Sequence, residues 1–379
     1  MLTKLYNEFF SSEKVGGLIL LIVTVLSLIT ANSAIGADYI EIWNYEIAGY
    51  SLVHWINDGL MAIFFLMIGL ELEREIYIGE LKDVKSAVLP IFGAVGGMLI
   101  PAFFFIIFNF GTSTQSGTGI PMATDIAFAI GILSLLGKKV PPSLKVFLVA
   151  LAVIDDLGAI LIIAFFYSKS VSVTYLALSL SVFIIMLVLN RLKVHNLIPY
   201  IIGGIIMWYF MHNSGVHATI TGVLLAIAIP FDDGGEKSPS YILQHYLHKP
   251  VAFLILPVFA IANTCIPLTI TWYSSLTHNY TIGIITGLFL GKPLGILIFS
   301  FISVKLGFCK LPQDLKWNNI IGVGFLAGIG FTMSIFITLL AFDNSVFINN
   351  SKIAILFASL ISGITGYFWL KNSLKYEYK

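Results

Sequence analysis

The sequence has 379 residues, of which 58% are hydrophobic and 11% are charged, with a mean hydropathy of +0.94. No soluble globular domain needs this much apolar material to fill its core, so the composition indicates a protein that lives in lipid. The net charge of +1 suggests no nucleic-acid partner, and the two cysteines, Cys265 and Cys309, supply neither a disulfide framework nor the spacing of a metal site.

Long apolar runs predict membrane-spanning helices. Backbone polar groups in hydrocarbon are satisfied only in helices or in a closed barrel, and these runs are too continuous for barrel strands of about ten alternating residues. With about 20 apolar residues for each span, the chain is expected to be an all-α polytopic membrane protein with about twelve transmembrane helices. In chain order they are predicted near residues 15–31, 57–71, 87–108, 119–136, 145–167, 173–189, 197–211, 215–230, 250–268, 280–304, 319–341 and 353–370.

The distribution of Lys and Arg orients these helices. With an even number of spans both termini share one side of the membrane, and 18 of the 21 basic residues then fall on that side. Lys169 and Lys352 fall on the other side, and Lys292 lies inside a span. Such a bias places both termini in the cytoplasm, and residues 1–379 are expected to form a single transmembrane domain in the bacterial inner membrane.

One outside loop, residues 38–57, is longer than the others. Its isoleucines Ile40, Ile42 and Ile47 alternate with polar residues. This pattern suggests a weak extracytoplasmic β-hairpin, with a plain loop as the alternative.

Four ionisable residues lie at bilayer depth: Asp125, Asp155, Asp156 and Lys292. Each costs roughly 3 kcal/mol of free energy to insert into a membrane, so the presence of each one requires a structural or functional explanation. Ion pairs that only hold helices together would account for any single residue. Three acids against one base, however, leave at least two carboxylates uncompensated. A mobile cation or proton is therefore expected to balance them.

Asp125 follows Gly119, Pro121 and Thr124, a combination that makes an uninterrupted helix over 119–136 improbable. Breaks at membrane depth are tolerated where they line a cavity, and they leave half-helix N-termini that carry partial positive charge. A carboxylate offsets such a charge. We therefore expect a broken helix here, with Asp125 as the compensating group or simply as the N-cap of the second half, which is the same physics.

Asp155 and Asp156 are neighbours in the middle of a predicted span. Adjacent residues on a helix point about 100° apart, so one can face a water-filled cavity while the other meets a neighbouring helix. Two carboxylates this close in a poorly solvated site cannot both stay ionised cheaply. The pair is therefore expected to hold either protons or a hard cation such as Na⁺ or Li⁺, and a cation that binds only after protons leave is the basis of exchange.

Lys292 lies in a run with glycine at every fourth position, Gly283, Gly287, Gly291 and Gly295, which predicts a smooth face for close helix contact. The simplest explanation of a lysine in a membrane span is that its side chain snorkels, extending its ammonium group to the membrane–water interface. About twelve apolar or small residues on each side place this one too deep for that, so a buried partner, Asp155 or Asp156, is expected.

A second interrupted span is predicted at 319–341, where glycines recur between Gly322 and Ser334. Counted from the other end of the chain, this break mirrors the one near Asp125. Two interrupted spans in corresponding halves are typical of inverted repeats that hold a transport site between them.

Five strings, in order along the chain, resemble the NhaA sodium/proton antiporters, and the resemblance runs from about Val15 to Leu370. They are Ala123-Thr-Asp-Ile-Ala-Phe128, Val153-Ile-Asp-Asp-Leu-Gly-Ala-Ile160, Gly215-Val-His-Ala-Thr219, Gly291-Lys-Pro-Leu-Gly295 and Gly328-Ile-Gly-Phe-Thr-Met-Ser-Ile-Phe336. No single string is decisive, but all five together are highly specific.

The resemblance implies an electrogenic antiporter that extrudes Na⁺ or Li⁺ in exchange for H⁺ and so serves sodium and pH homeostasis. It assigns cation and proton binding to Asp155 and Asp156, with Lys292 paired to Asp155 when the cation is absent. It also implies that Asp125 and its neighbour Thr124 balance the crossing of the broken helices, and that Lys292 supports the opposite helix ends. No cofactor is implied beyond the transported ions.

Regulation by pH from the cytoplasmic face is a further property that the resemblance implies, at Glu71, Glu75, His217 and His245. For His245 the alternative to a role in pH sensing is that it is an ordinary solvated charged side chain in a loop. The sequence departs from the family pattern at four positions, Glu73, Gln244, Tyr241 and Ile242, so the pH at which the family becomes active does not carry over directly. Activity at a more acidic pH than usual would be consistent with these departures. The family also forms a homodimer through its outside hairpin, so a dimer is a further expectation.

Other classes of protein fit less well. An intramembrane aspartyl protease would need Gly-x-Gly-Asp before one aspartate, and that string is absent, so no enzyme activity is expected. An ATP-driven pump is not expected, because no GxxxxGK[ST] motif is present. A cation-coupled solute symporter would keep the carboxylates and remains the alternative, since only the resemblance favours antiport. A purely structural membrane protein would leave the four buried ionisable residues unexplained.

Overall fold

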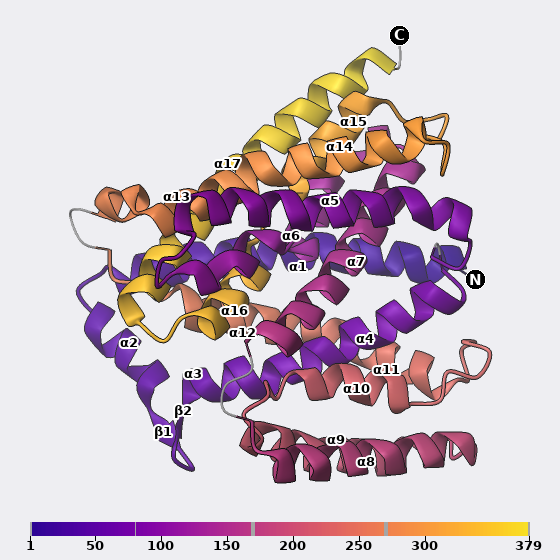
Figure 1. Ribbon diagram of the computed structural model, residues 1–379, viewed down its shortest axis with the longest axis vertical. Helices are drawn as coiled ribbons and strands as arrows, with labels where there is room; N and C mark the ends of the chain where they lie inside the picture. The colour runs from indigo at the N-terminus through magenta and orange to yellow at the C-terminus, as the bar shows by residue number, and fades with distance from the viewer. Residues whose placement is uncertain (1, 80, 168–170, 269–271, 378–379) are drawn as a thin grey trace. The chain divides into compact units, whose positions relative to one another are not determined.

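The structure is a computed structural model that describes residues 2–79, 81–167, 171–268 and 272–377, and most of these residues are helical (Figure 1). Within those ranges the only strands are the two of one short hairpin. The predicted all-α membrane fold is confirmed. Lys169, one of the two basic residues predicted to face outside, lies outside the described residues.

By length and hydropathy alone, the described residues contain fewer candidate spans than the about twelve predicted. Among the described residues, eight helical stretches are long and apolar enough to cross a membrane, and two bent helix pairs raise the number to ten. The predicted spans at 197–211 and 215–230 correspond to α9 (Ile198–Asn213) and α10 (Ile220–Ala228), of 16 and 9 residues. At 1.5 Å per residue α10 covers only about 14 Å, roughly half of a hydrocarbon core. Gly215, with φ +82°, lies in the non-helical segment before α10, and at its other end α10 stops where Ile229, directly before Pro230, adopts an extended backbone.

The chain divides into two compact units, each built from separated stretches. The first comprises Met1–Ser33, Asp83–Ala159 and Ile266–Lys379, and the second comprises Ala34–Lys82 and Ile160–Cys265. The expectations of a single transmembrane domain and of two cytoplasmic termini stay predictions.

The first unit contains both predicted helix breaks. Its helices, in chain order, are α1 (Leu2–Ala31), α5 (Val84–Asn109), η2 (Gln115–Met122), α6 (Ile126–Leu135), η3 (Gly137–Lys139), most of α7 (Pro142–Phe166), η5 (Trp272–Thr277), α13 (Asn279–Thr286), η6 (Gly287–Gly291), α14 (Lys292–Lys305), α15 (Trp317–Ala327), α16 (Phe331–Ala341), α17 (Ser345–Ser373) and η7 (Leu374–Glu377). Helix α17 begins eight residues before the predicted span, so Lys352 lies inside the helix and is buried.

The predicted glycine face of residues 283–295 packs against α5 (Figure 1). A Cβ added to Gly291 would lie 2.9 Å from Pro101 Cα, and one added to Gly295 would meet the carbonyl oxygen of Gly96. Real side chains do not approach backbone so closely, so only glycine permits this contact. The close approach brings α14, which begins at Lys292, directly against α5.

A widened, π-helical turn, η6, comes immediately before Lys292. Pro293 explains it, because proline has no N–H to give to the carbonyl of Phe289 and its ring crowds that carbonyl. The same pairing of a π-helical turn with a following proline recurs at η4 (Val251–Ile255) and Pro257 in the second unit.

Both predicted interruptions are present. Between η2 and α6, residues 123–125 are not helical, and Asp125 has an extended backbone as the N-cap of α6. Between α15 and α16, the break at residues 328–330 bends the two helices by 48°. The inverted repeat that would relate these breaks stays a prediction.

The second unit consists of shorter helices around a hydrophobic cluster that includes Leu70, Tyr200 and Met207. Its elements are α2 (Gly36–Asn44), β1 (Glu46–Ile47), β2 (Tyr50–Ser51), α3 (Leu52–His54), η1 (Trp55–Leu60), α4 (Met61–Tyr77), the end of α7, α8 (Val173–Arg191), α9, α10, α11 (Pro239–Pro250), η4 and α12 (Leu256–Thr264).

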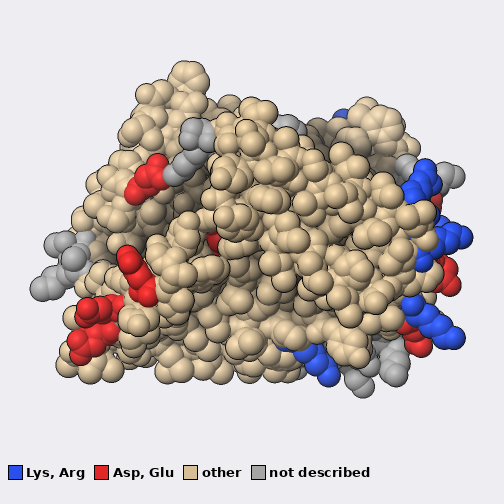
Figure 2. Space-filling model, turned by 90° about the horizontal axis from the view of Figure 1, so that it is seen from below, with Lys and Arg blue, Asp and Glu red and all other residues tan. Residues whose placement is uncertain are grey.

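The face over which α8 and α9 lie is shown in Figure 2. Lys and Arg gather at one end of this face, together with some acidic residues, whereas the other end shows acidic residues without Lys or Arg, and an almost uncharged surface lies between the two ends. Exposed side chains on the two helices include Ile184, Ile185, Ile202 and Ile205. A wide apolar band bounded by charge is the surface expected of helices in contact with lipid.

The long outside loop contains both a helix and a hairpin. Strands β1 and β2 pair antiparallel, with Glu46 opposite Ser51 and Ile47 opposite Tyr50. The two loop residues, Ala48 and Gly49, both have positive φ, as the tightest hairpin turn requires. The predicted hairpin is thus present but only over residues 46–51. Residues 36–44 form α2, so the alternation of Ile40 and Ile42 was misread as a strand pattern.

Candidate ion-binding site

Asp155 and Asp156 lie in the interior of the 25-residue helix α7 in the first unit. Each is only 1% exposed. Because they are neighbours on a helix, their side chains diverge by about 100° and cannot make the same contacts. The two carboxylates therefore form one buried acidic position with two different surroundings.

Lys292 forms an ion pair with the first of these aspartates. Its Nζ lies 2.7 Å from Asp155 Oδ2, and neither side chain is exposed to solvent. Thr124 Oγ1 lies 2.8 Å from the same carboxylate oxygen. Of the two partners that the sequence left open for Lys292, the structure shows a direct ion pair with Asp155.

The other oxygen of this carboxylate, Asp155 Oδ1, is buried and has no hydrogen-bond partner among the described residues. A buried carboxylate oxygen with no donor is costly, because it has lost water without gaining a replacement. Asp155 therefore keeps one coordination position open while its second oxygen is already engaged. A proton or a hard cation could occupy that position.

Carbonyl groups at two helix ends complete the surroundings of the ion pair. Lys292 Nζ also donates to the carbonyl of Met122, the last residue of η2. Thr124 Oγ1 lies 2.9 Å from the carbonyl oxygen of Ala327, the last residue of α15. A hydroxyl has one hydrogen, so Thr124 donates either to Ala327 or to Asp155 at any one time. The C-terminal ends of both half-helices, which carry partial negative charge, thus meet donors.

Asp125 meets the opposite ends of the same two broken helices. Its Oδ1 accepts from the N–H of Phe128 at 3.0 Å in the first turn of α6. Its Oδ2 accepts from the N–H of Thr332 at 3.0 Å, and from the Thr332 hydroxyl, in the first turn of α16. The Asp125 N–H in turn donates to the carbonyl of Ile329 at 2.6 Å. One buried carboxylate therefore caps two half-helices that come from distant parts of the sequence.

The charges of this centre can be summed. The two helix N-termini together carry about one positive charge, roughly what Asp125 offsets. Lys292 offsets one further carboxylate. The two helix C-termini together add about one negative charge, so the fixed groups leave about two negative charges over around the pair Asp155 and Asp156. A buried centre of this kind needs a mobile cation or a proton for electroneutrality.

Two contacts of the centre were not predicted from the sequence. Thr124 was expected, together with Asp125, to balance the crossing of the broken helices, and its hydroxyl does contact the end of α15, but its contact with Asp155 was not predicted. Thr332, which makes two contacts to Asp125, was not singled out, although it stands two residues after Gly330 at the start of a predicted half-helix. A threonine in the first turn after a glycine break was the available signal.

The residues implied in pH sensing lie in the second unit, and the structure does not gather all four. Glu71 and Glu75 follow one another by one turn on α4, where Glu71 is buried. His245 is exposed on α11, with its ring stacked on Tyr241. His217 precedes α10, and its Nε2 lies 2.9 Å from the carbonyl oxygen of Tyr167.

The comparisons with known proteins agree with this geometry. The family model described as Na⁺/H⁺ antiporter 1 matches residues 7–370. The Na⁺/H⁺ antiporter NhaA 1 of Flavobacterium johnsoniae is 66% identical over 98% of both chains, and the NhaA antiporter of Vibrio cholerae is 47% identical over 98% of this chain and 99% of its own.

A solved structure adds to the likeness at the level of the fold. The sodium proton antiporter of Methanocaldococcus jannaschii matches 97% of this chain and 100% of its own with a TM-score of 0.53 at 17% identity. Two broken helices, a buried aspartate pair and a full-length match to the family model lead to one conclusion: the chain belongs to the NhaA family of Na⁺/H⁺ antiporters.

Proposed function

We propose that this protein exchanges Na⁺ for H⁺ across the membrane at the pair Asp155 and Asp156. Membership of the antiporter family supports the exchange. The observation that carries the choice of site is the open, buried oxygen of Asp155 next to a second buried carboxylate. Oxygen ligands of this kind suit hard cations.

In the proposed mechanism the cation and the lysine compete for the same carboxylate. The arrangement in which Lys292 holds Asp155 corresponds to the state without cation. An entering Na⁺ bridges the two aspartates, displaces the ammonium group from Asp155 and requires that protons leave the site. When the cation departs, protons return and the ion pair closes again. Exchange follows because the cation and the protons cannot occupy the site together.

Electrogenic exchange is part of the proposal. Asp156 and the Asp155–Lys292 pair each offer a place for a proton once the cation has gone. A cycle that takes up two protons for one Na⁺ moves net charge across the membrane, so the membrane potential would contribute to the driving force. Li⁺, which is also a hard monovalent cation, is proposed as a second substrate. The transported ions need no cofactor.

The test of this function is Na⁺-driven proton flux in everted membrane vesicles, followed by dequenching of a pH-sensitive dye. Wild-type protein should give a signal on addition of NaCl, and Asp156→Asn should reduce it to background while the protein elutes normally from size exclusion. The matched control is Asp314→Asn, which changes an exposed carboxylate in the same way. Undiminished flux in Asp156→Asn would overturn the proposed site.

Symport of an organic solute with the cation is not supported, since the relatives named above are antiporters. The vesicle assay separates the two cases directly. An antiporter moves protons on addition of Na⁺ alone, whereas a symporter moves them only when its solute is also present.

We propose the inner membrane as the location and the lipid bilayer as the immediate surroundings of the protein. The uncharged band of Figure 2 supports contact with lipid. The excess of Lys and Arg on the side of the termini supports a cytoplasmic position for both. Labelling of single cysteines introduced at Lys82 and at Glu46 would test this, because only the second should react with an impermeant reagent added to intact cells.

Regulation by pH is proposed to involve Glu71, Glu75, His217 and His245. The burial of Glu71 one turn from Glu75 supports a role for that pair, because two nearby carboxylates with little water respond to the proton concentration. Glu71→Gln should then shift the pH at which exchange begins. An unchanged pH profile would remove Glu71 from this role.

A homodimer through the hairpin of residues 46–51 is also proposed. A two-stranded sheet has two open edges, and Glu46, Ile47 and Tyr50 are exposed. Removal of residues 46–51 should convert the dimer to a monomer in light scattering of the purified protein. A deletion variant that stays dimeric would exclude this interface.

A further inference from the structure

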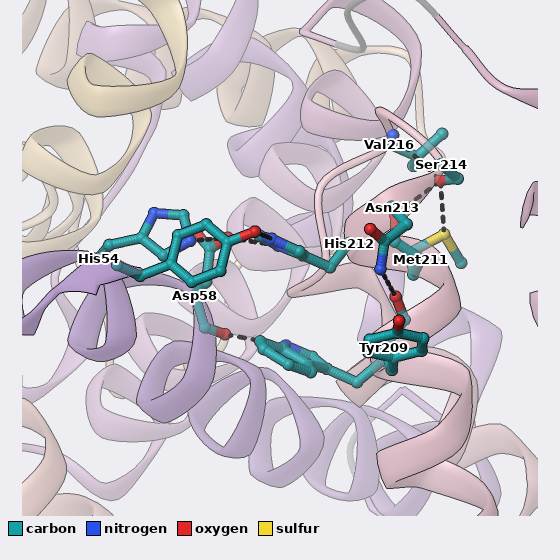
Figure 3. A network of polar contacts seen from close by, with 10 residues as sticks. His54, Asp58, Tyr209, Met211, His212, Asn213, Ser214 and Val216 are labelled. Carbon is teal, nitrogen blue, oxygen red and sulfur yellow. Dashed lines mark hydrogen bonds and ion pairs between the residues drawn. The ribbon is translucent and has the colours of Figure 1, made fainter. Parts of the chain in front are cut away.

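A second cluster of ionisable side chains lies in the second unit and has no part in the function described above. His54 is the last residue of α3, Asp58 lies one turn later in η1, and His212 lies near the end of α9 (Figure 3). The two histidines approach the carboxylate of Asp58 from different helices.

The two distances to the carboxylate of Asp58 match those between neighbouring ligand atoms around a metal ion. His212 Nδ1 lies 3.4 Å and His54 Nε2 lies 3.6 Å from the same oxygen, Asp58 Oδ2. All three atoms lie within 4.8 Å of one another. The His54 contact is long for a hydrogen bond, and His54 Nε2 is buried with no hydrogen-bond partner among the described residues. Hydrogen bonding alone therefore does not account for the position of this nitrogen.

Coordination of a zinc ion accounts for the position of His54 Nε2 better than hydrogen bonding does. Bonds from Zn²⁺ to imidazole nitrogen and carboxylate oxygen are about 2.0–2.2 Å long, so tetrahedral angles place neighbouring ligand atoms roughly 3.3–3.6 Å apart. Both distances to Asp58 Oδ2 fall in that interval. Two histidines and one carboxylate are also a donor set that Zn²⁺ accepts, with a water as the fourth ligand.

Neighbouring aromatic side chains already fix the orientation of the imidazole rings of His54 and His212. His212 Nε2 lies 3.2 Å from the Tyr50 hydroxyl, which leaves Nδ1 facing Asp58. A metal-binding histidine typically has its second nitrogen fixed by such a partner. The ring of His212 stacks on Trp208 with centroids 5.5 Å apart, and the ring of His54 stacks on Tyr50 at 4.7 Å. Binding of an ion would thus require little reordering of the two imidazoles.

The cluster is accessible from solvent, unlike the aspartate pair of the first unit. The side chains of His54, Asp58 and His212 are 36%, 23% and 18% exposed. Asp58 lies in a π-helical turn, a local irregularity often found at functional sites. Its backbone carbonyl is fixed by the indole N–H of Trp208 at 3.3 Å.

We propose that His54, Asp58 and His212 bind one divalent transition-metal ion of the Zn²⁺ type, which links η1 to α9. Asp58 supplies one oxygen, each histidine supplies one nitrogen and water completes the tetrahedron. Tyr50 holds the His212 ring in the orientation that the metal needs. This site is separate from the exchanged Na⁺, because imidazole nitrogens favour transition metals such as Zn²⁺ and not alkali cations.

The test uses the full-length protein in detergent, freed of any polyhistidine tag. Zn²⁺ affinity and stoichiometry are measured by competition with a chromophoric chelator, and Co²⁺ is added separately to read the geometry from its visible absorption. Wild-type protein should bind one Zn²⁺ per chain and give the intense bands of tetrahedral Co²⁺. His212→Gln and His54→Gln should each lose at least tenfold in Zn²⁺ affinity. Tyr50→Phe should weaken binding about tenfold, the lower end of the usual effect of removing such a partner.

Two matched controls come from the same chain. His195 Nε2 lies 3.3 Å from Asp232 Oδ2 but has no second histidine in that contact, so His195→Gln should leave Zn²⁺ affinity unchanged. His248→Gln tests the alternative that His245 and His248, three residues apart on α11, hold the metal, and it too should change nothing.

The outcome that overturns the proposal is equally specific. Wild-type affinity in both His54→Gln and His212→Gln, or a loss confined to His248→Gln, would place the metal elsewhere, and an absence of stoichiometric Zn²⁺ binding to wild-type protein would leave no site at all. His54 is partly exposed, so its replacement is expected to leave folding intact, and the elution position of each variant is compared with wild type to exclude misfolding.

Discussion

The protein contains two clusters that combine aspartate with a basic group, and they differ in burial. In the first unit, Asp155 and Lys292 are completely shielded from solvent. In the second unit, the side chains of His54, Asp58 and His212 are 18–36% exposed. Both clusters join polar side chains from different helices, yet only the first must balance its charges within the protein.

Burial explains why the two clusters are built differently. A charge in the first unit has no water to stabilise it, so each one meets a lysine, a hydroxyl or the end of a half-helix. The broken helices are needed there because an intact helix has no free ends in the middle of the membrane. In the second unit, water can stabilise the charges, and the histidines can be neutral or charged at modest cost. Removing one group should therefore matter far more in the first cluster than in the second.

The largest effect is expected for Lys292→Ala. Removing one partner of a buried ion pair leaves Asp155 without its counter-charge, and such a change typically costs about 3–5 kcal/mol of unfolding free energy. Lys292 also donates to Met122 at the end of η2, and that contact would be lost as well. Unfolding of the purified protein in mixed micelles measures the change, and the pH profile of exchange should shift too.

The control for this variant is Lys305→Ala on the same helix, α14, where the lysine is exposed. It should change stability by less than about 1 kcal/mol. Equal losses in the two variants would mean that the buried pair contributes nothing specific.

A smaller loss is expected for Thr332→Val, which keeps the shape of the side chain but removes the hydroxyl that contacts Asp125. Hydrogen bonds to charged groups contribute about 1.5–3 kcal/mol. The matched control is Thr338→Val on the same helix, whose hydroxyl donates to the carbonyl of Ser334 within the helix. If both valine variants lose the same stability in mixed micelles, the Thr332 hydroxyl has no special part in capping the two half-helices.

The smallest effect is expected for His54→Ala when no transition metal is present. Its contact with Asp58 is partly exposed, and such pairs contribute about 0.2–1 kcal/mol. Unfolding in the presence of a chelator measures this value. A loss as large as that of Lys292→Ala would show that exposure does not separate the two clusters.

Much of the architecture followed from local patterns in the sequence. Long apolar runs predicted helices, and the glycine-rich stretches near Gly119 and Gly328 predicted both interruptions, because glycine and proline act on their own neighbours. The glycine spacing between 283 and 295 predicted the close contact that α5 supplies. The four deep ionisable residues were recognisable because charge in an apolar run is rare.

Contacts between residues far apart in the sequence were either not predicted or were predicted only as a choice between two partners. Thr124 was expected to balance the crossing of the broken helices together with Asp125, and its further contact with Asp155, 31 residues along the chain, was not predicted. The sequence left two partners open for Lys292. The cluster of His54, Asp58 and His212 joins residues more than 150 positions apart, and only His54 and Asp58, at a spacing of four, carried any local signal.

The sequence by itself determined that the chain enters a membrane as helices, where those helices break and which charges are buried, because hydropathy and backbone freedom are properties of short segments. Only the tertiary structure decided that Lys292 pairs with Asp155 and that Asp125 caps both α6 and α16. It also decided that α10 is too short to span a bilayer. These outcomes depend on which helices lie side by side, and packing between distant segments sets that.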